Sequence, residues 1–583
     1  MDKELPLSKY ITQSQNIKPD TYNKKIKIGI LSSFTINGLA EVLKQKCAEK
    51  KIGCFTYVGP YNQYNQEILN EKSNLYSFSP DITFLILDVQ NIFGELFYNP
   101  YSISDLEREN YVEEKVNELV NLINRFTLSS SKLVITNLVS PSYSPYGIAE
   151  MKTKYSFDDA ITDFNKKIKE KLFNLDNVYL LDFNKFVKKF GEKNIFNFQN
   201  YFFGDIKISL DLIPYLGNEL ISYVIAILGL TKKCIVLDLD NTIWGGVIGE
   251  DGFDGIRLGP QPPGNTFFEF QKHLKALSER GIILAINSKN NFNDAIKVIC
   301  EHPYMVLRED DFACIRINWE DKVTNMYEIS KELNIGLDSF VFLDDDPVNR
   351  ELIKKFIPQI LVPEFPTNTA ELVPLLQSLN EFSILKITNE DAKRGEMYVQ
   401  QKKREELKEK IPDLNEFLKT LDLQVTVKQS DSFTIPRISQ LTLKTNQFNL
   451  TTRRYSENDI NKFAHDKNML VGCASIKDKF GDNGITGVFI IEKLNFEEWF
   501  IESFLLSCRV MGREVEKAIL NYIINEARKN NVKRLLAKYV PTDKNKPIEG
   551  FLEDNGFIKK DEYWIFDLQK PFNMPKFLTL SVG

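Results

Sequence analysis

The stretch CIVLDLDNTIWGGVIGEDG, residues 234–252, decides the fold of the middle of this chain. Its first four residues, Cys234–Leu237, predict a short buried strand, and two carboxylates, Asp238 and Asp240, come just past it. Alternate positions of an extended chain share a side. Ligands of open α/β sheets collect at the carboxyl ends of strands, so the two acids can converge on one substrate. Carboxylates this close repel each other, and a hard divalent cation such as magnesium offsets the repulsion.

Three further predicted strands end in polar groups that complement the two acids. One strand leads into a hydroxyl and an ammonium, the next into a lysine, and the last into a run of acids. In chain order these are Gly281–Ile286 with Asn287, Ser288 and Lys289, Ala313–Asn318 with Lys322, and Phe340–Leu343 with Asp344 and Asp345. Phosphoryl transfer needs such a set: a nucleophile, a general acid/base, a cationic group that binds the phosphoryl oxygens, and metal ligands. Acids after strands also serve as helix caps and turn formers, but four such ends in this order favour a functional site.

The composition limits the class of protein. The chain has 583 residues, which suggests three or four domains. With 43% apolar and 26% charged residues it resembles an ordinary soluble globular protein. The net charge is -6 and no basic stripe is present, so nucleic acid is not an expected partner. Only three histidines occur, and the seven cysteines form no CxxC pair, so neither a disulfide framework nor a zinc site is predicted.

Neither a membrane span nor a secretory signal is expected. No run reaches about 18 uninterrupted apolar residues, and the uncharged run from Leu220 to Leu230 predicts a buried helix. The N-terminus has no apolar signal core, so a cytoplasmic location is expected.

The order of elements divides the chain into three units. Residues 1–229 alternate apolar runs with amphipathic stretches, as in a parallel α/β sheet, and residues 230–388 do so again. A charged segment, 389–412, predicts a solvated connecting helix. Residues 413–583 form the third unit, whose expected strands are Leu421–Val427, Met469–Ile476, Thr486–Glu492 and Glu498–Ser507.

The motifs DxDxT, Ser, Lys and DD resemble those of the haloacid dehalogenase (HAD) superfamily. The resemblance implies that Asp238 attacks phosphorus to form an aspartyl-phosphate, while Asp240 protonates the leaving oxygen and later activates water. Ser288 and Lys322 would hold the phosphoryl oxygens, with Lys289 as a competitor for the lysine role. The implied Mg²⁺ ligands are Asp238, the backbone carbonyl of Asp240 and Asp345, with Asp344 in support. Thr242, Asn287 and Lys289 are further candidates for phosphate or substrate contacts.

The chain resembles one family within this superfamily more closely than the superfamily as a whole. The runs DLDNTIWGGVIGEDG, SKNN, NWEDK and VFLDDDPVNRE resemble the FkbH-like family, HAD subfamily IIIC. Between Thr242 and Ser288 lie a Gly-rich flap and one helix, too little for a large cap domain. A site without a lid suits a bulky, protein-borne substrate.

The third unit resembles a GNAT acyltransferase. The residues Arg509-Val-Met-Gly512-Arg513-Glu514 follow a strand and open a helix, Val515–Lys529, whose N-terminus could hold a phosphate. A strand at Arg534–Val540 and the run NKPIEGFLEDNGF follow. The family usually ends the turn with a small residue, whereas this chain has Glu514. This departure argues against tight pyrophosphate binding and ordinary acetyl-CoA use.

Cys508 stands directly before that turn, next to Arg509 and a helix start, where a thiol could act as an acyl carrier. The alternative is a cysteine packed in a strand. Cys234 is the second candidate, although it begins a buried strand.

The run LTLKTNQFNLTTRRYS, residues 441–456, is also typical of FkbH-like proteins. It could bind an anionic substrate or form a solvated helix face, and both interpretations stay open. Its polar members are Lys444, Asn446, Gln447, Asn449, Arg453 and Arg454. Nearby, KDKFGDNGITG (477–487) predicts a hairpin with an Asn-Gly turn.

The first unit, with LSSFTINGL and YVGPYNQYNQEI, resembles the N-terminal region of the same family, an SGNH-hydrolase-like fold. Ser32 or Ser33 could be read as an esterase nucleophile, but residues 1–229 contain no histidine, so no Ser/His/Asp relay can form within the unit. A non-hydrolytic docking or scaffolding domain is expected. Gly59, Tyr61 and Gln63 either line a pocket or form a polar aromatic loop.

Together the resemblances imply an α/β chain of three units: an SGNH/flavodoxin-like domain, a HAD Rossmann-like parallel sheet with a minimal cap, and a GNAT-like mixed α+β domain. FkbH-like proteins take a glyceryl unit from 1,3-bisphosphoglycerate, remove its remaining phosphate and load it onto the phosphopantetheine thiol of an acyl carrier protein in polyketide-type biosynthesis. The resemblance implies the same reaction here, with a discrete carrier or a polyketide synthase domain as partner. The alternatives are a HAD phosphatase whose third unit only binds a carrier or a sugar phosphate, and a non-catalytic carrier-protein adaptor.

Overall fold

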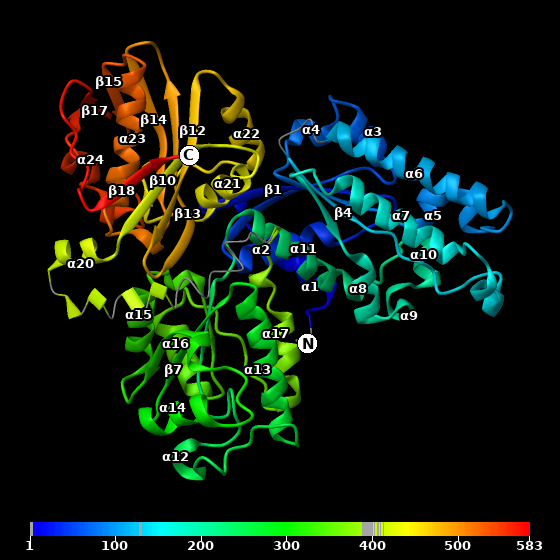
Figure 1. The fold of residues 1–583 in the computed structure, drawn as a ribbon. Coiled ribbons are helices and arrows are strands. Elements are labelled where there is room, and N and C mark those ends of the chain that lie inside the picture. Colours follow the sequence, from blue (N-terminus) through cyan, green and yellow to red (C-terminus); the bar gives the residue numbers. More distant parts are fainter. Residues whose placement is uncertain are drawn as a thin grey trace. The chain divides into compact units, whose positions relative to one another are not determined.

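The computed structural model describes residues 4–126, 131–386, 400–401, 403–404, 407–408, 410–411 and 413–583 (Figure 1). Contacts divide the chain into two compact units, residues 2–227 and 228–583. The expected connecting helix at 389–412 falls largely outside the described residues. The predicted class, a multidomain α/β chain with two parallel sheets and a mixed sheet, is confirmed.

The first unit is built on a five-stranded parallel sheet in the order β2-β1-β3-β4-β5. Its strands are β1 (Lys24–Ser32), β2 (Ile52–Val58), β3 (Ile82–Ile86), β4 (Lys132–Thr136) and β5 (Val178–Leu181). The end of β1 is buried without alternation, which is typical of a parallel strand covered on both faces.

Two groups of helices accompany this sheet. Helices α6 (Asp105–Phe126) and α7 (Phe157–Leu172) share a core with one side of the strands, while α1 (Leu7–Ser14), α2 (Leu39–Glu49) and α11 (Ile213–Ile227) pack together. The shorter helices are α3 (Tyr64–Leu69), α4 (Asn74–Phe78), α5 (Val89–Phe93), α8 (Phe183–Phe190), α9 (Glu192–Ile195) and α10 (Phe198–Gly204). Leu210–Ile227 is long and apolar enough to cross a membrane, but half of it is buried within the protein. The apolar run around Leu220 is thus a buried helix, as predicted, although the helix starts earlier.

The next sheet has four parallel strands in the order β8-β7-β6-β9. They are β6 (Cys234–Leu237), β7 (Ile283–Ser288), β8 (Phe312–Ile317) and β9 (Phe340–Leu343). Alternate residues of β6 enter different cores: Ile235 and Leu237 pack with α13 and α14, and Cys234 and Val236 with α15 and α16. The helices are α12 (Ile248–Asp251), α13 (Gly264–Glu279), α14 (Phe292–Glu301), α15 (Lys322–Leu333), α16 (Pro347–Phe356) and α17 (Leu372–Ser378).

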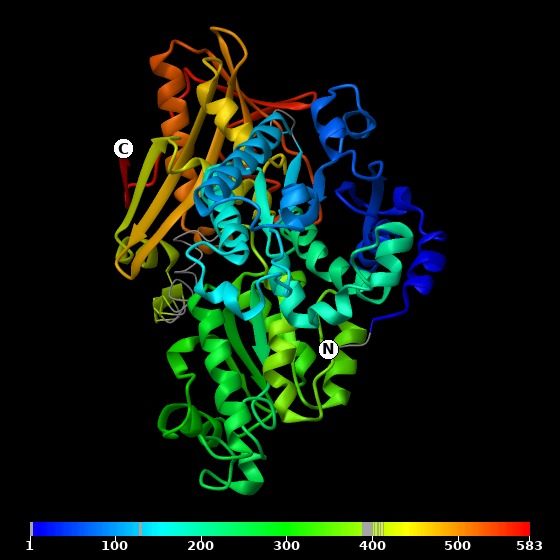
Figure 2. The ribbon, with the colours of Figure 1, turned by 90° about the vertical axis from the view of Figure 1, so that its right-hand side faces the viewer.

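The third sheet is mixed and runs β16-β17-β15-β14-β13-β12-β10-β18, with β11 beside β14. Its central strands are β10 (Leu423–Gln429), β12 (Met469–Asp478), β13 (Gly481–Lys493) and β14 (Glu498–Leu506). Around them lie β11 (Phe448–Asn449), β15 (Arg534–Ala537), β16 (Ile558–Lys560), β17 (Tyr563–Asp567) and β18 (Leu578–Val582). The helices are α20 (Leu414–Thr420), α21 (Ile435–Lys444), α22 (Glu457–His465), α23 (Val515–Lys529) and α24 (Phe551–Asp554). Helix α23 lies along one face of the sheet, and α21 and α22 share a core with the other (Figure 2).

Two local predictions for this sheet are corrected. Strand β15 stops at Ala537, where its pairing with Ile501 of β14 ends, and further along β14 the residues Leu505 and Leu506 pair with β11. The hairpin of β12 and β13 turns at Lys479 and Phe480, and not at Asn483-Gly484, which lies inside β13.

The side chain of Asp478 explains the position of the turn. Its Oδ1 accepts the backbone N–H groups of Phe480 (2.9 Å) and Gly481 (3.3 Å). The same buried carboxylate takes two hydrogen bonds from Arg404 (2.7 and 2.8 Å) and one from Arg513 (3.1 Å). The hairpin turn, Arg404 and the turn before α23 are therefore joined by one buried charge.

We predict that Asp478→Asn lowers the free energy of unfolding of this unit by about 3–5 kcal/mol, because two buried guanidinium groups lose their counter-charge. Calorimetry of the variant would measure the loss. Asp482→Asn, an exposed acid of the same hairpin, is the matched control and should change stability little. Equal effects of the two substitutions would contradict the assigned role of Asp478.

Candidate active site

The polar groups of the four-stranded sheet meet at the carboxyl ends of its strands. Asp238 follows β6, and its backbone N–H donates to Leu343 O at the end of β9 (3.0 Å). This bond places the first acid next to Asp344 and Asp345, which follow β9. Ser288 ends β7, and Lys322 is the first residue of α15. Parallel strands thus deliver to one place residues that lie about a hundred positions apart.

A buried lysine holds two of the acids together. The Lys322 Nζ lies 3.0 Å from Asp238 Oδ1 and 2.6 Å from Asp344 Oδ2. Burial alone would lower the pKa of the Lys322 ammonium, but the two carboxylates outweigh it and raise that pKa. Lys322 is therefore charged at neutral pH and forms the cationic centre of the site.

The acids outnumber this cation. One oxygen each of Asp238, Asp344 and Asp345 lies within 4.8 Å of the others. Burial, with the charges of Asp238 and Asp344 added to it, raises the pKa of Asp345 to about 6, and burial likewise raises the pKa of Asp344. Three carboxylate oxygens around one point form a donor set that a hard divalent cation fits. Asp240 does not contribute a side-chain oxygen to this group of three.

The side chain of Asp240 is held by other contacts. Its Oδ1 accepts the indole N–H of Trp244 (2.9 Å) and the backbone N–H of Ile248 (3.1 Å), and its Oδ2 accepts from Asn290 Nδ2 (3.0 Å). Burial raises the pKa of Asp240. Asn290 Nδ2 also lies 3.3 Å from Ser288 Oγ, so it links the acid to the hydroxyl. Sequence reasoning did not single out Trp244 and Asn290, although they stand inside the quoted runs DLDNTIWGGVIGEDG and SKNN.

The other predicted contacts of this sheet have different surroundings. Thr242 is fully buried, and its Oγ1 has no hydrogen-bond partner within the described structure. Asn287 donates to Lys322 O (2.9 Å) and accepts from Asn325 (3.1 Å), so it positions the start of α15. Lys289 is exposed, whereas the ammonium between the acids belongs to Lys322.

A second group of predicted residues lines a cavity of about 490 Å³ in the unit of residues 228–583. Lys444, Asn446, Gln447, Cys508 and Arg509 are among its lining residues. Cationic side chains outnumber acidic ones there, because Lys233, Arg437 and Lys544 add to Lys444 and Arg509, against Asp338 and Asp543. The cavity brings together a thiol and basic groups and suits an anionic ligand.

Several other candidates do not line this cavity. Arg513 is bound to Asp478 and to Arg509 O (2.6 Å). Arg454 donates to Thr442 O (2.8 Å) and Asn446, and Arg453 pairs with Glu502, which raises the pKa of that guanidinium. Asn449 is buried in β11, and Gly512 supplies a positive φ of 77° in the turn before α23. Cys234 is buried in β6, where burial raises the pKa of its thiol well above the ordinary value.

Comparisons with known proteins find one family model and one solved protein that are similar to large parts of the chain. Residues 27–225 match the family model of the FkbH N-terminal domain. The solved N-terminal part of the protein BF1531 from Bacteroides fragilis, which contains a phosphatase domain and is complexed with Mg, is similar to this chain. The two are 28% identical with a TM-score of 0.60, over 66% of this chain and 100% of that one.

Acetyltransferases match a smaller share of the chain. A GNAT-family acetyltransferase from Staphylococcus aureus Mu50 is 12% identical (TM-score 0.21; 25% of this chain and 99% of that one). The ribosomal-protein-S18-alanine N-acetyltransferase from Escherichia coli is 13% identical (TM-score 0.19; 24% of this chain and 88% of that one). These similarities are too slight to show a shared activity. No curated protein matches the sequence.

We predict that Asp345→Asn stabilises the metal-free protein at neutral pH. Wild-type Asp345 keeps its proton in the fold up to about pH 6 but ionises near 3.8 when unfolded. Between these pH values the folded state therefore binds one more proton than the unfolded state does. The free energy of unfolding falls as the pH rises through this range. In EDTA the melting temperature of Asp345→Asn should match wild type at pH 4 and exceed it at pH 7.

Added Mg²⁺ should reverse that order at pH 7, because the variant has lost a carboxylate ligand. Thermal denaturation at both pH values, with EDTA or Mg²⁺, measures both effects. An unchanged difference between the two proteins across the pH range would rule out the charge repulsion described above.

Proposed function

We propose that this chain is a Mg²⁺-dependent phosphatase coupled to acyl transfer, because residues 27–225 match the FkbH N-terminal domain and a solved protein with a phosphatase domain is similar to the chain. Its substrate would be 1,3-bisphosphoglycerate, whose glyceryl unit it dephosphorylates and loads onto the phosphopantetheine thiol of an acyl carrier protein. The observation that carries the phosphatase half is the position of Lys322 between Asp238 and Asp344, with Asp345 beside them.

In the phosphatase half, a carboxylate oxygen of Asp238 attacks the phosphorus atom of the phosphate ester. The P–O bond to the substrate breaks, and Asp240 gives its proton to the departing oxygen. The raised pKa of Asp240 suits this role, because the carboxyl keeps its proton closer to neutral pH. Asp240 then takes a proton from water, which attacks the aspartyl-phosphate and releases inorganic phosphate. Lys322 and Ser288 hold the phosphoryl oxygens.

Asp238, Asp344 and Asp345 would hold the metal ion, and their mutual repulsion in its absence supports this assignment. When bound, Mg²⁺ supplies positive charge that offsets the carboxylates and the phosphate. The similar Bacteroides fragilis protein was solved with Mg, which supports the choice of cation.

The cavity around Cys508 supports the acyl-transfer half. In this proposal the Cys508 thiolate attacks the carbonyl carbon of the acyl phosphate, a C–S bond forms, and the C–O bond to phosphate breaks. The carrier thiol then attacks the thioester and regenerates Cys508. Arg509 and Lys444 line the same cavity and would bind the anionic phosphates.

We predict that Asp238→Asn lowers phosphate release from a phosphate monoester by about 1,000-fold or more, because the amide is not a nucleophile. A phosphate-release assay with Mg²⁺ measures the rate. Asp346→Asn is the matched control from the third acid of the DDD run, whose role is to accept the backbone N–H of Val348 at the start of α16. It should stay within a few-fold of wild type, and substantial activity in Asp238→Asn would exclude the aspartyl-phosphate route.

We predict that Cys508→Ala blocks loading of a holo-carrier protein but spares hydrolysis of simple phosphate monoesters. The assay combines protein, Mg²⁺, 1,3-bisphosphoglycerate and holo-carrier, and the carrier is weighed by mass spectrometry. Cys300→Ala, an exposed cysteine on α14, is the control and should load normally.

The outcomes of this assay separate the alternatives. A glyceryl mass on the carrier with wild type, but not with Cys508→Ala, supports the relay. Phosphate release without any loading would indicate a phosphatase alone. The absence of both phosphate release and loading would indicate a carrier-protein adaptor.

A further inference from the structure

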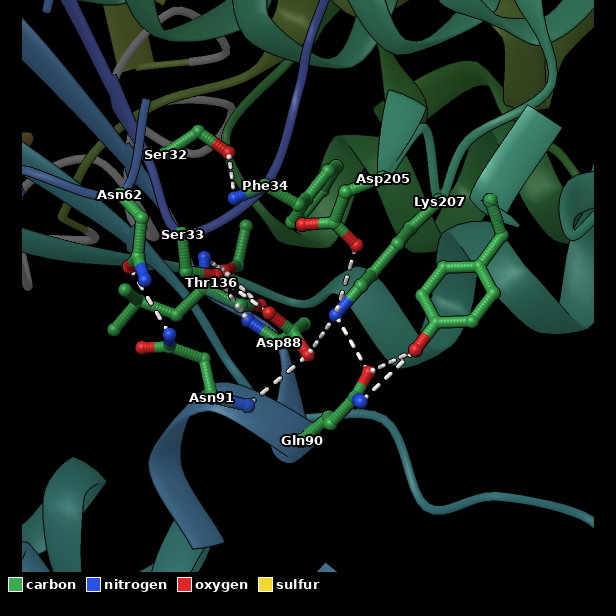
Figure 3. A network of polar contacts seen from close by, with 12 residues as sticks. Ser32, Ser33, Phe34, Asn62, Asp88, Gln90, Asn91, Thr136, Asp205 and Lys207 are labelled. Atoms are coloured by element: carbon green, nitrogen blue, oxygen red, sulfur yellow. Dashed lines mark hydrogen bonds and ion pairs between the residues drawn. The ribbon is translucent and has the colours of Figure 1, made fainter. Parts of the chain in front are cut away.

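The first unit contains a cavity of about 620 Å³ that is lined by none of the residues of the candidate active site. The chain places β2 on one side of β1 and β3 on the other, so the order 2-1-3-4-5 has its topological switch point between β1 and β3. In open α/β sheets the crevice at this point is where ligands bind. Ser33 follows β1 and Asp88 follows β3, and both lie at this crevice (Figure 3).

At the floor of the cavity, polar side chains form a hydrogen-bond network among themselves. Ser33 Oγ donates to Asp88 Oδ2 (2.7 Å) and accepts the backbone N–H of Asp88 (3.0 Å). Lys207 Nζ donates to Asp88 Oδ1 (2.7 Å) and Gln90 Oε1 (2.9 Å), and lies 3.6 Å from Asp205 (Figure 3). The hydroxyl of Ser33 is thus engaged as donor and as acceptor, and no histidine exists in the unit to activate it. This floor is built to bind rather than to carry out nucleophilic catalysis.

Aromatic side chains surround this floor. Tyr201 hydrogen-bonds with Gln90, and Tyr61 OH donates to Asp205 Oδ2 (2.7 Å). Phe202 and Phe203, in α10, also line the cavity although 77% and 85% of their surfaces are exposed. Exposed apolar rings around a polar floor are a combination that commonly marks a ligand site. Of the loop residues singled out in the sequence, Tyr61 lines the cavity.

The charges exclude an anionic ligand. Lys207 is the cationic side chain among the lining residues, and Asp88 and Asp205 already neutralise it. Glu95 adds a further negative charge at the wall. A phosphate or carboxylate would therefore meet net negative charge on entering.

We propose that this cavity binds a neutral, hydroxyl-rich ligand of sugar size. The volume lies within the range of small-molecule sites, about 300–1,000 Å³. The carboxylate oxygens of Asp205 and Glu95, which line the cavity, can accept hydrogen bonds from the hydroxyls of such a ligand, and the rings match the apolar face of a sugar ring. The site is separate from the phosphatase chemistry, so it stands whether or not the proposed function does.

The test is saturation-transfer NMR on the full-length protein with neutral mono- and disaccharides of hexoses, deoxyhexoses and N-acetylhexosamines. Glucose 6-phosphate and spermidine serve as the anionic and cationic probes. Phe202→Ser should raise the Kd of the bound sugar about tenfold, because it removes one aromatic contact. Phe173→Ser is the matched control, since Phe173 is a similarly exposed ring of the same unit that does not line the cavity.

Saturable binding of a neutral sugar, weakened by Phe202→Ser and not by Phe173→Ser, supports the proposal. Gln90→Ala should weaken binding as well, and phosphate release should be unchanged in all three variants. The proposal is overturned if no neutral sugar binds, if either charged probe binds more tightly than every sugar, or if the two phenylalanine variants bind alike.

Discussion

The contact on which the candidate active site depends is the buried ammonium of Lys322 between Asp238 and Asp344. A buried charge without a partner costs several kcal/mol, so each of these three groups stabilises the other two in place. The ion pair joins the end of β6, the end of β9 and the start of α15. With Asp345 beside the pair, three carboxylates face one ammonium, and this excess of negative charge is what makes the place suitable for a divalent cation.

The same geometric rule produces two different sites in this chain. In both parallel sheets the polar groups gather where strands end, because parallel strands bring their carboxyl ends to one edge. The β6–β9 edge collects acids around a lysine, which suits phosphoryl chemistry. The β1–β3 edge collects a network in which Ser33, Asp88 and Lys207 satisfy one another, which leaves a binding surface framed by aromatic rings. Shared architecture therefore says little about chemistry, and the side chains at the edge decide it.

In the unit that contains the mixed sheet, charges that stabilise the fold are separate from charges that line the cavity. Arg513 and Arg404 are committed to the buried Asp478, and Arg454 is committed to its own segment. Arg509 and Lys444 instead line the cavity that also contains Cys508. The turn before α23 thus uses one arginine for the fold and presents another to the cavity. Strand β11 contributes to the same region by pairing with β14 beyond the point where β15 ends.

Local sequence was enough to predict the strands, the acids after β6 and β9, and helix α23, because apolar periodicity and strand-end polarity are properties of neighbouring residues. It also identified Lys322 through its place in the motif order. The partners of side chains could not be predicted in this way. Asn290 and Trp244 on Asp240, the hairpin turn set by Asp478, and the cavity between Ser33 and Lys207 all join residues whose proximity exists only after the sheets form. Periodicity reports which face a residue occupies, whereas hydrogen bonds and ion pairs between distant segments depend on how those faces are packed together.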